Sequence, residues 1–93
     1  MIRGFRDRET QRIWNGEASR RIPQDIQAVA LRKLRLLNRA RSLNDLRVPP
    51  GNELEALKKD RLGQHAIRIN RQWRICFVWK EGNAYEVEIV DYH

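Results

Sequence analysis

Apolar residues recur every three or four positions between Pro23 and Arg41. No Gly or Pro lies between these two residues. Spacing of this kind is typical of an amphipathic helix. Pro23 suits the first helical turn, and Asp25 follows it where a carboxylate complements the helix dipole. On a helical projection one arc collects the apolar side chains Ile26, Ala30, Leu34 and Leu37. The pattern therefore predicts a long helix with one buried face.

In the last third of the chain the apolar spacing shortens to every second residue, which is the period of a half-buried strand. Three such runs lie at residues 65–69, 73–79 and 85–89. The short polar segments 70–72 and 81–83 separate them and predict tight turns. Three consecutive strands joined in this way predict an antiparallel meander.

Weaker patterns fill the rest of the chain. Residues 2–5 predict a brief strand, and residues 8–15 predict a short helix that ends at an Asn-Gly pair. Residues 42–46 read as a turn or short helical hook, and the two prolines within 48–52 predict a loop. The order of strand, two helices and meander predicts an α+β fold, with the helices packed on one face of the sheet.

Composition adds a strong positive charge to this picture. The 93 residues suffice for one domain, covering 1–93, and carry 19 Lys and Arg against 12 Asp and Glu, for a net charge of +7. Arginine supplies 15 of the basic groups, and its planar guanidinium matches phosphate geometry. The whole excess falls in residues 1–47. The composition therefore favours a polyanionic partner.

The lone Cys76 lies within the apolar run 75–79 and predicts a buried thiol in a reducing compartment. The N-terminal segment lacks the apolar stretch of a signal peptide, and no apolar run exceeds five residues. We therefore expect a cytoplasmic protein that does not span a membrane.

The sequence contains no CxxC, HExxH or glycine-rich phosphate loop, so neither a metal nor a cofactor is expected. The final residues Asp91, Tyr92 and His93 can all accept or donate protons, and they follow directly after the last predicted strand. General acid–base chemistry needs such groups close together. The alternative is an ordinary polar chain end.

Arg74 interrupts a strand that is otherwise rich in apolar residues, and it lies on the face opposite them. Antiparallel pairing would bring it towards Asp91 and His93, where an arginine can stabilise a reacting phosphate. A structural ion pair from Arg74 to Glu86 or Glu88 is the alternative.

Further basic residues fall into three sets. Arg68 and Arg71 share the ambiguity of Arg74, and Lys58 precedes the meander together with two further basic residues, Lys59 and Arg61. The predicted long helix carries an outer stripe of Arg32, Arg35 and Arg39. For Arg68 and Arg71 the alternatives are an anion-binding site or a structural ion pair. For the Lys58 set and the helix stripe they are an anion-binding surface or a solvated surface.

Three segments and the final tripeptide carry a resemblance to a known family. The segments are Asn52–Leu57, Gly63–Asn70 and Gln72–Phe77, and the tripeptide is Asp91-Tyr92-His93. They resemble HigB-type host-inhibition toxins of the RelE/ParE superfamily. Together with the length, the basic charge and the order of helices and meander, the resemblance covers nearly the whole chain. The resemblance implies a RelE-like fold and a bacterial type II toxin that enters the 70S ribosome and cleaves messenger RNA in the A site without a metal. It also implies a HigA-type helix-turn-helix antitoxin, through which alone operator DNA would be contacted.

The resemblance further implies roles for single residues. The family's catalytic arginine falls on Arg74, its terminal set falls on Asp91, Tyr92 and His93, and a catalytic basic position falls on Lys58. A contact to the RNA backbone is implied for Arg68. With this function, we expect Arg71 to contact RNA as well, and the stripe of Arg32, Arg35 and Arg39 to bind ribosomal RNA through its charge.

One departure concerns Glu55, which stands where some members have a histidine, so part of the proton-transfer apparatus is altered. Two other classes stay open: a ParE-like inhibitor of DNA gyrase without nuclease activity, and a non-enzymatic RNA-binding module.

Overall fold

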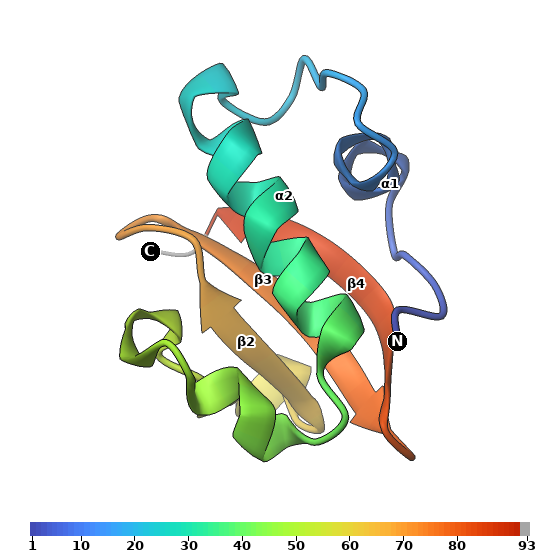
Figure 1. Cartoon of the computed structure of the whole chain (residues 1–93), viewed down its shortest axis with the longest axis vertical. Helices are drawn as coiled ribbons and strands as arrows, with labels where there is room; N and C mark the ends of the chain where they lie inside the picture. The colour runs from blue at the N-terminus through green and yellow to red at the C-terminus, as the bar shows by residue number, and fades with distance from the viewer. Residues whose placement is uncertain (92–93) are drawn as a thin grey trace.

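The computed structural model describes residues 1–91, and it combines two α-helices with a four-stranded antiparallel sheet of order β1-β2-β3-β4 (Figure 1). The helices are α1 (Arg8–Trp14) and α2 (Gln24–Arg39), and the strands are β1 (Glu55–Ala56), β2 (Gln64–Arg68), β3 (Trp73–Lys80) and β4 (Asn83–Asp91). Three short 3₁₀ helices lie between α2 and β2, namely η1 (Leu43–Arg47), η2 (Pro50–Asn52) and η3 (Lys59–Arg61). The predicted α+β arrangement is confirmed.

Helix α2 packs across one face of the sheet, as its apolar arc predicted (Figure 1). Pro23 caps its start, and the four apolar residues of the predicted arc are all buried. They meet the sheet side chains Ile67, Ile75, Phe77 and Val87, which are fully buried. Burial of each large apolar side chain contributes about 1.5–3 kcal/mol, so this layer is the main source of stability.

A buried threonine ties helix α1 to the sheet by a hydrogen bond. Asp7 caps the helix by accepting the Thr10 N–H at 3.3 Å, and Asn15 and Gly16 end it where the sequence predicted. The hydroxyl oxygen of Thr10 accepts the backbone N–H of Ile89 in β4 at 2.9 Å. Since Thr10 is fully buried, this bond fixes α1 against the strand that ends in Asp91.

The strand predicted at residues 2–5 is reduced to two isolated parallel bridges, Ile2 with Ala84 and Phe5 with Val87. Backbone bonds join this segment to the outer edge of β4, including Arg3 N–H to Ala84 C=O at 2.8 Å and Arg6 N–H to Val87 C=O at 2.9 Å. The pairing is not continuous because Glu86 of β4 has a left-handed backbone, with φ of 49°.

A bulge in the β3–β4 pairing corrects the predicted alternation of the last strand. Cys76 lies opposite Glu88 while Val78 lies opposite Tyr85, so β4 holds one extra residue between these pairs. An extra residue reverses the faces of the side chains beyond it. Tyr85 therefore does not share the buried face of Val87, although the sequence period placed them together.

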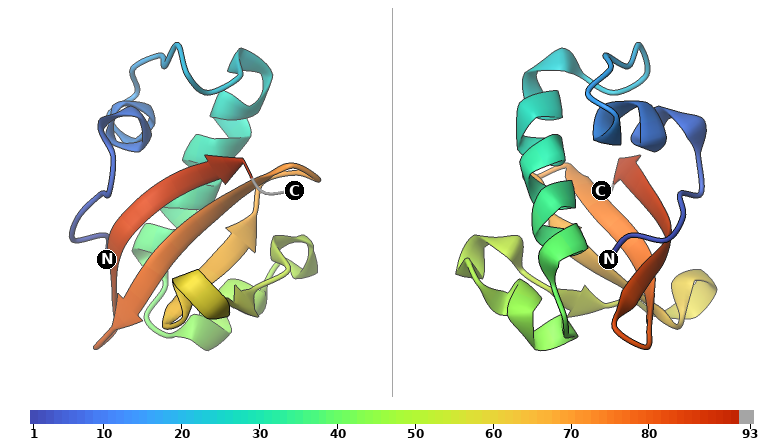
Figure 2. Two further views of the ribbon diagram at one scale, coloured as in Figure 1. Left: turned by 180° about the vertical axis from the view of Figure 1, so that it is seen from behind. Right: turned by 45° about the vertical axis from the view of Figure 1, so that its right-hand side comes forward.

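The other face of the sheet is free of α1 and α2 (Figure 2). Its apolar part is a small cluster of Leu57, Ala66, Cys76 and the edge of Val90. Cys76 is buried as expected, and burial raises the pKa of its thiol. We call this surface the helix-free face. Within residues 1–91 no helix has the length and apolar character needed to cross a bilayer.

Candidate functional site

Two arginines lie directly opposite each other on the helix-free face. Arg74 of β3 and Arg68 of β2 are cross-strand partners, so their side chains leave the sheet side by side. The Arg74 side chain is 17% exposed and that of Arg68 is 33% exposed. Like charges directly opposite on a sheet destabilise it, and an anion between them removes that penalty. We call these two residues the arginine pair.

A carboxylate of the chain itself lies against the arginine pair. One oxygen of Glu53, Oε2, is 3.1 Å from Nη1 of Arg68 and 3.7 Å from Nη1 of Arg74. The sequence had suggested Glu86 or Glu88 as ion-pair partners for Arg74. The structure instead shows Glu88 close to Arg61 at 2.7 Å and Arg6 at 3.9 Å.

The end of β4 reaches the start of β3, as the predicted meander required. Asp91 lies opposite Trp73, and Val90 lies opposite Arg74. Because neighbouring side chains on a strand point to opposite faces, Asp91 is directed away from the helix-free face on which Arg74 lies. The Gln72 amide donates to both carboxylate oxygens of Asp91 at 3.1 Å. Tyr92 and His93 lie outside the described residues, so their predicted roles stay predictions.

Lys58 lies in the connection between β1 and β2, where η3 crosses in front of the helix-free face (Figure 2). Its side chain is exposed and lines an open hollow of about 340 Å³, together with Glu55 and Lys59. In η3, Arg61 donates to Gln64 at 3.0 Å and to Glu88 at 2.7 Å, which holds this connection against the sheet.

The remaining predicted RNA contacts fall on other surfaces. Arg71 is exposed in the turn between β2 and β3. The stripe of Arg32, Arg35 and Arg39 is exposed on α2, which covers the opposite face of the sheet from the arginine pair (Figures 1 and 2). The structure thus divides the basic candidates between two surfaces of the molecule.

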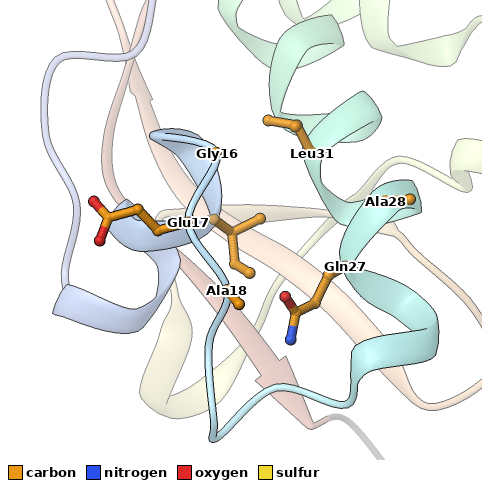
Figure 3. A pocket seen from close by; sticks show the side chains of 7 residues that line it. Gly16, Glu17, Ala18, Gln27, Ala28 and Leu31 are labelled. Atoms are coloured by element: carbon orange, nitrogen blue, oxygen red, sulfur yellow. The ribbon is translucent and has the colours of Figure 1, made fainter.

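A separate hollow of about 220 Å³ lies between the end of α1 and α2 (Figure 3). Glu17 is the ionisable group among its lining residues, and it pairs with Arg12 at 3.6 Å. The Gln27 amide beside it donates to the carbonyls of Ser19 at 2.9 Å and Ile22 at 2.7 Å. A lining with one paired carboxylate offers little for phosphate chemistry.

Sequence reasoning missed three polar residues in structurally important places. Glu53 is one, and Lys33 and Asn52, which are buried together behind it, are the others. An Asn within a Pro-Pro-Gly-Asn segment signalled a turn, but no spacing pattern links it to Lys33. Among residues 1–91 there is no cluster of three or more His, Cys, Asp or Glu side chains placed to hold a metal ion.

The layering of two helices on one face of an antiparallel sheet defines the class as an α+β protein. Residues 3–93 match the family described as RelE-like toxin of type II toxin-antitoxin system HigB, so the chain belongs to that family. It is 37% identical over 85 residues to Toxin HigB-1 of Vibrio cholerae, covering 90% of each chain. It is also 29% identical over 94 residues to a Proteus vulgaris protein named Endoribonuclease HigB, covering 100% of each. The resemblance stated from the sequence is confirmed, and a toxin of this kind has an antitoxin as its partner.

Proposed function

We propose that this toxin is an endoribonuclease that cleaves messenger RNA in the A site of the bacterial 70S ribosome, with residues 1–93 acting as one domain. The observation that carries the proposal is the arginine pair, which presents two guanidinium groups side by side on the helix-free face. Guanidinium forks bind phosphate in a fixed geometry. The name of the Proteus vulgaris relative supports the same activity.

The chemistry requires no metal, because RNA carries its own nucleophile. The 2′-hydroxyl attacks the adjacent phosphate, a 2′,3′-cyclic phosphate forms, and the bond to the 5′-oxygen breaks. Arg74 neutralises the charge that builds on the phosphate oxygens, and Lys58, at the opposite end of β2 from the arginine pair, adds positive charge from farther away. Of Asp91 and His93, one removes the 2′-hydroxyl proton and the other protonates the leaving oxygen. Since Asp91 is directed away from Arg74, it would act from around the end of the sheet.

The division of basic residues supports two RNA contacts with different tasks. The arginine pair holds the messenger, while the α2 stripe of Arg32, Arg35 and Arg39 binds ribosomal RNA through its charge. Arg71, exposed in the turn beside β3, adds to the messenger contact. The antitoxin is of the HigA type with a helix-turn-helix domain, and operator DNA is reached only through it.

The test is to map the 5′ ends of messenger RNA after induction of the toxin and of the variant Arg74→Ala. We expect new ends inside translated codons with the unaltered chain and none with the variant. Loss of these ends when translation initiation is blocked would establish the dependence on ribosomes. Growth inhibition with broken DNA and unchanged messenger ends would instead identify a ParE-like gyrase inhibitor and overturn the proposal.

A further inference from the structure

Glu53 has a backbone conformation that is unusual for a residue with a side chain. Its φ of 44° and ψ of 53° lie in the left-handed region, which disfavours residues with a Cβ. The residue before it, Asn52, is fully buried and donates hydrogen bonds to the carbonyls of Leu46 at 3.1 Å and Val48 at 3.3 Å. The backbone of Glu53 is therefore fixed by a buried anchor immediately before it.

This anchor directs the Glu53 carboxylate to the arginine pair. The carboxylate carries one negative charge, as a phosphodiester does, and one of its oxygens lies within 4 Å of both guanidinium groups, at 3.1 and 3.7 Å. The Glu53 side chain is 54% exposed, more than that of either arginine. It is thus the outermost member of the cluster and can move into solvent without disturbing the sheet.

We propose that Glu53 is a built-in competitor for the phosphate site, which occupies the arginine pair in the free toxin and leaves when an RNA phosphate binds. The inference rests on the proposed function, because it takes the ligand of the arginine pair to be the RNA backbone. No covalent bond is made or broken. One carboxylate is exchanged for one phosphodiester.

The competition lowers RNA affinity and also its dependence on salt. Exposed ion pairs contribute little, so removing the Glu53 charge should tighten RNA binding by about two- to fivefold. While the carboxylate is present, the arginine pair neutralises less of the phosphate charge, so the RNA releases fewer of its condensed counterions on binding. Without the carboxylate, the slope of log affinity against log salt should steepen by up to about 0.7, the contribution of one phosphate contact on a single strand.

The experiment is an NMR titration of the full chain with a short RNA in which every 2′-hydroxyl is methylated, so that it binds without being cleaved. The probes are the guanidinium Nε–Hε signals of Arg68 and Arg74. Three proteins are compared at several salt concentrations: the unaltered chain, Glu53→Gln and Glu17→Gln. Glu17 is a matched control because it also forms an exposed ion pair with an arginine, at 3.6 Å, on a different surface.

We expect half-saturation at a two- to fivefold lower RNA concentration in Glu53→Gln, with a steeper salt slope, and no change in Glu17→Gln. Equal titrations of Glu53→Gln and the unaltered chain, or arginine signals that do not respond to RNA, would overturn the inference. A cleavage assay on programmed ribosomes gives a second readout, in which Glu53→Gln should lower KM and the control Glu17→Gln should leave both KM and kcat unchanged. A large fall in kcat would mean that Glu53 takes part in the chemistry, and would also overturn it.

The two proposals fail in different ways. If Arg74→Ala abolishes cleavage while Glu53→Gln titrates like the unaltered chain, the nuclease proposal stands and the competitor does not. If Arg74→Ala still cleaves but Glu53→Gln binds RNA more tightly, the phosphate site stands and the assigned role of Arg74 in the nuclease does not.

Discussion

Lys33 and Asn52 are buried together, and the Lys33 ammonium donates a hydrogen bond to the Asn52 side-chain oxygen. Burial, and then the neighbouring charge of Arg32, lowers the pKa of the Lys33 ammonium. The contact joins α2 to the loop that presents Glu53. It is therefore a link between the two basic surfaces of the molecule, the α2 stripe and the arginine pair.

Replacing Lys33 by Met should destabilise the protein by about 1–3 kcal/mol, because the buried Asn52 oxygen loses its donor. Urea unfolding followed by Trp fluorescence measures this. Lys80→Met, at an exposed position, should change stability by less than about 0.5 kcal/mol. A Lys33→Met variant as stable as the unaltered chain would show that the desolvated ammonium costs as much as its bond contributes.

Replacing Thr10 by Val should also cost about 1–3 kcal/mol, since the Ile89 N–H is left buried without an acceptor. The shape of the side chain is nearly unchanged, so packing is not the cause. Thr10→Ser keeps the hydroxyl and should recover most of the loss. Equal stability of the Val and Ser variants would argue against the hydrogen bond as the link between α1 and β4.

His65 should make the protein less stable in mild acid. Its ring stacks on Phe77 with centroids 6.2 Å apart, and burial lowers its pKa. The unfolded chain therefore takes up the His65 proton at higher pH than the folded chain. The contribution of neutral His65 to the free energy of unfolding is fully present above the ordinary histidine pKa of about 6.5, and it is lost as the pH drops below that value. His65→Gln should flatten the dependence of the free energy of unfolding on pH between 7.5 and 5.5. An unchanged slope would mean that other groups cause the pH dependence.

Arg74→Ala should lower the rate of messenger cleavage by about 10²–10³-fold, the typical effect of losing one group that stabilises a reacting oxyanion. Folding and antitoxin binding should persist, and circular dichroism and co-purification check them. Arg74→Lys keeps the charge without the planar fork, so its cleavage rate should lie between those of the unaltered chain and Arg74→Ala. Arg47→Ala, at an exposed position on η1, is the matched control. Cleavage retained in Arg74→Ala would remove Arg74 from the mechanism.

Reversing Arg32, Arg35 and Arg39 to Glu should weaken association with ribosomes and flatten its salt dependence, because three phosphate contacts are lost. The arginine pair lies on the other side of the sheet and should be unaffected, so NMR titration of Arg68 with RNA should be unchanged. The triple substitution to Lys keeps the charge and is the control. If the Glu variant binds ribosomes like the unaltered chain at every salt concentration, the stripe is only a solvated helix face.

The helical and strand periods of the sequence predicted the parts of the fold that depend on local pattern. Burial of Leu34 and Leu37 and the position of Arg74 on the sheet face opposite the main core follow from spacing alone. Strand β1 escaped prediction because two residues, Glu55 and Ala56, carry no period and pair only once β2 is in place. Glu53 escaped it because its position depends on the left-handed turn after a buried anchor, which no spacing rule contains.

The candidate site was predicted in its strand order but not in its side-chain geometry. The meander correctly brought the end of β4 beside the start of β3. Asp91 lies two residues after Ile89, which faces the core, so the two side chains point to the same face of the sheet. This signal was present in the sequence. The bulge opposite Phe77 could not be predicted from the sequence. Apolar residues alternate regularly over 85–89, although the β3–β4 pairing is interrupted there.

The N-terminal segment that runs beside β4 has a consequence for self-association. An open strand edge is a template for pairing with another molecule. Ile2 and Phe5 bridge to β4 and occupy one edge of the sheet, and at the other edge β1 has two exposed residues, one of them the charged Glu55. Neither edge offers a long, flat, apolar strand, and the positive net charge adds mutual repulsion. The toxin is thus built to resist edge-to-edge aggregation when it is freed from its antitoxin.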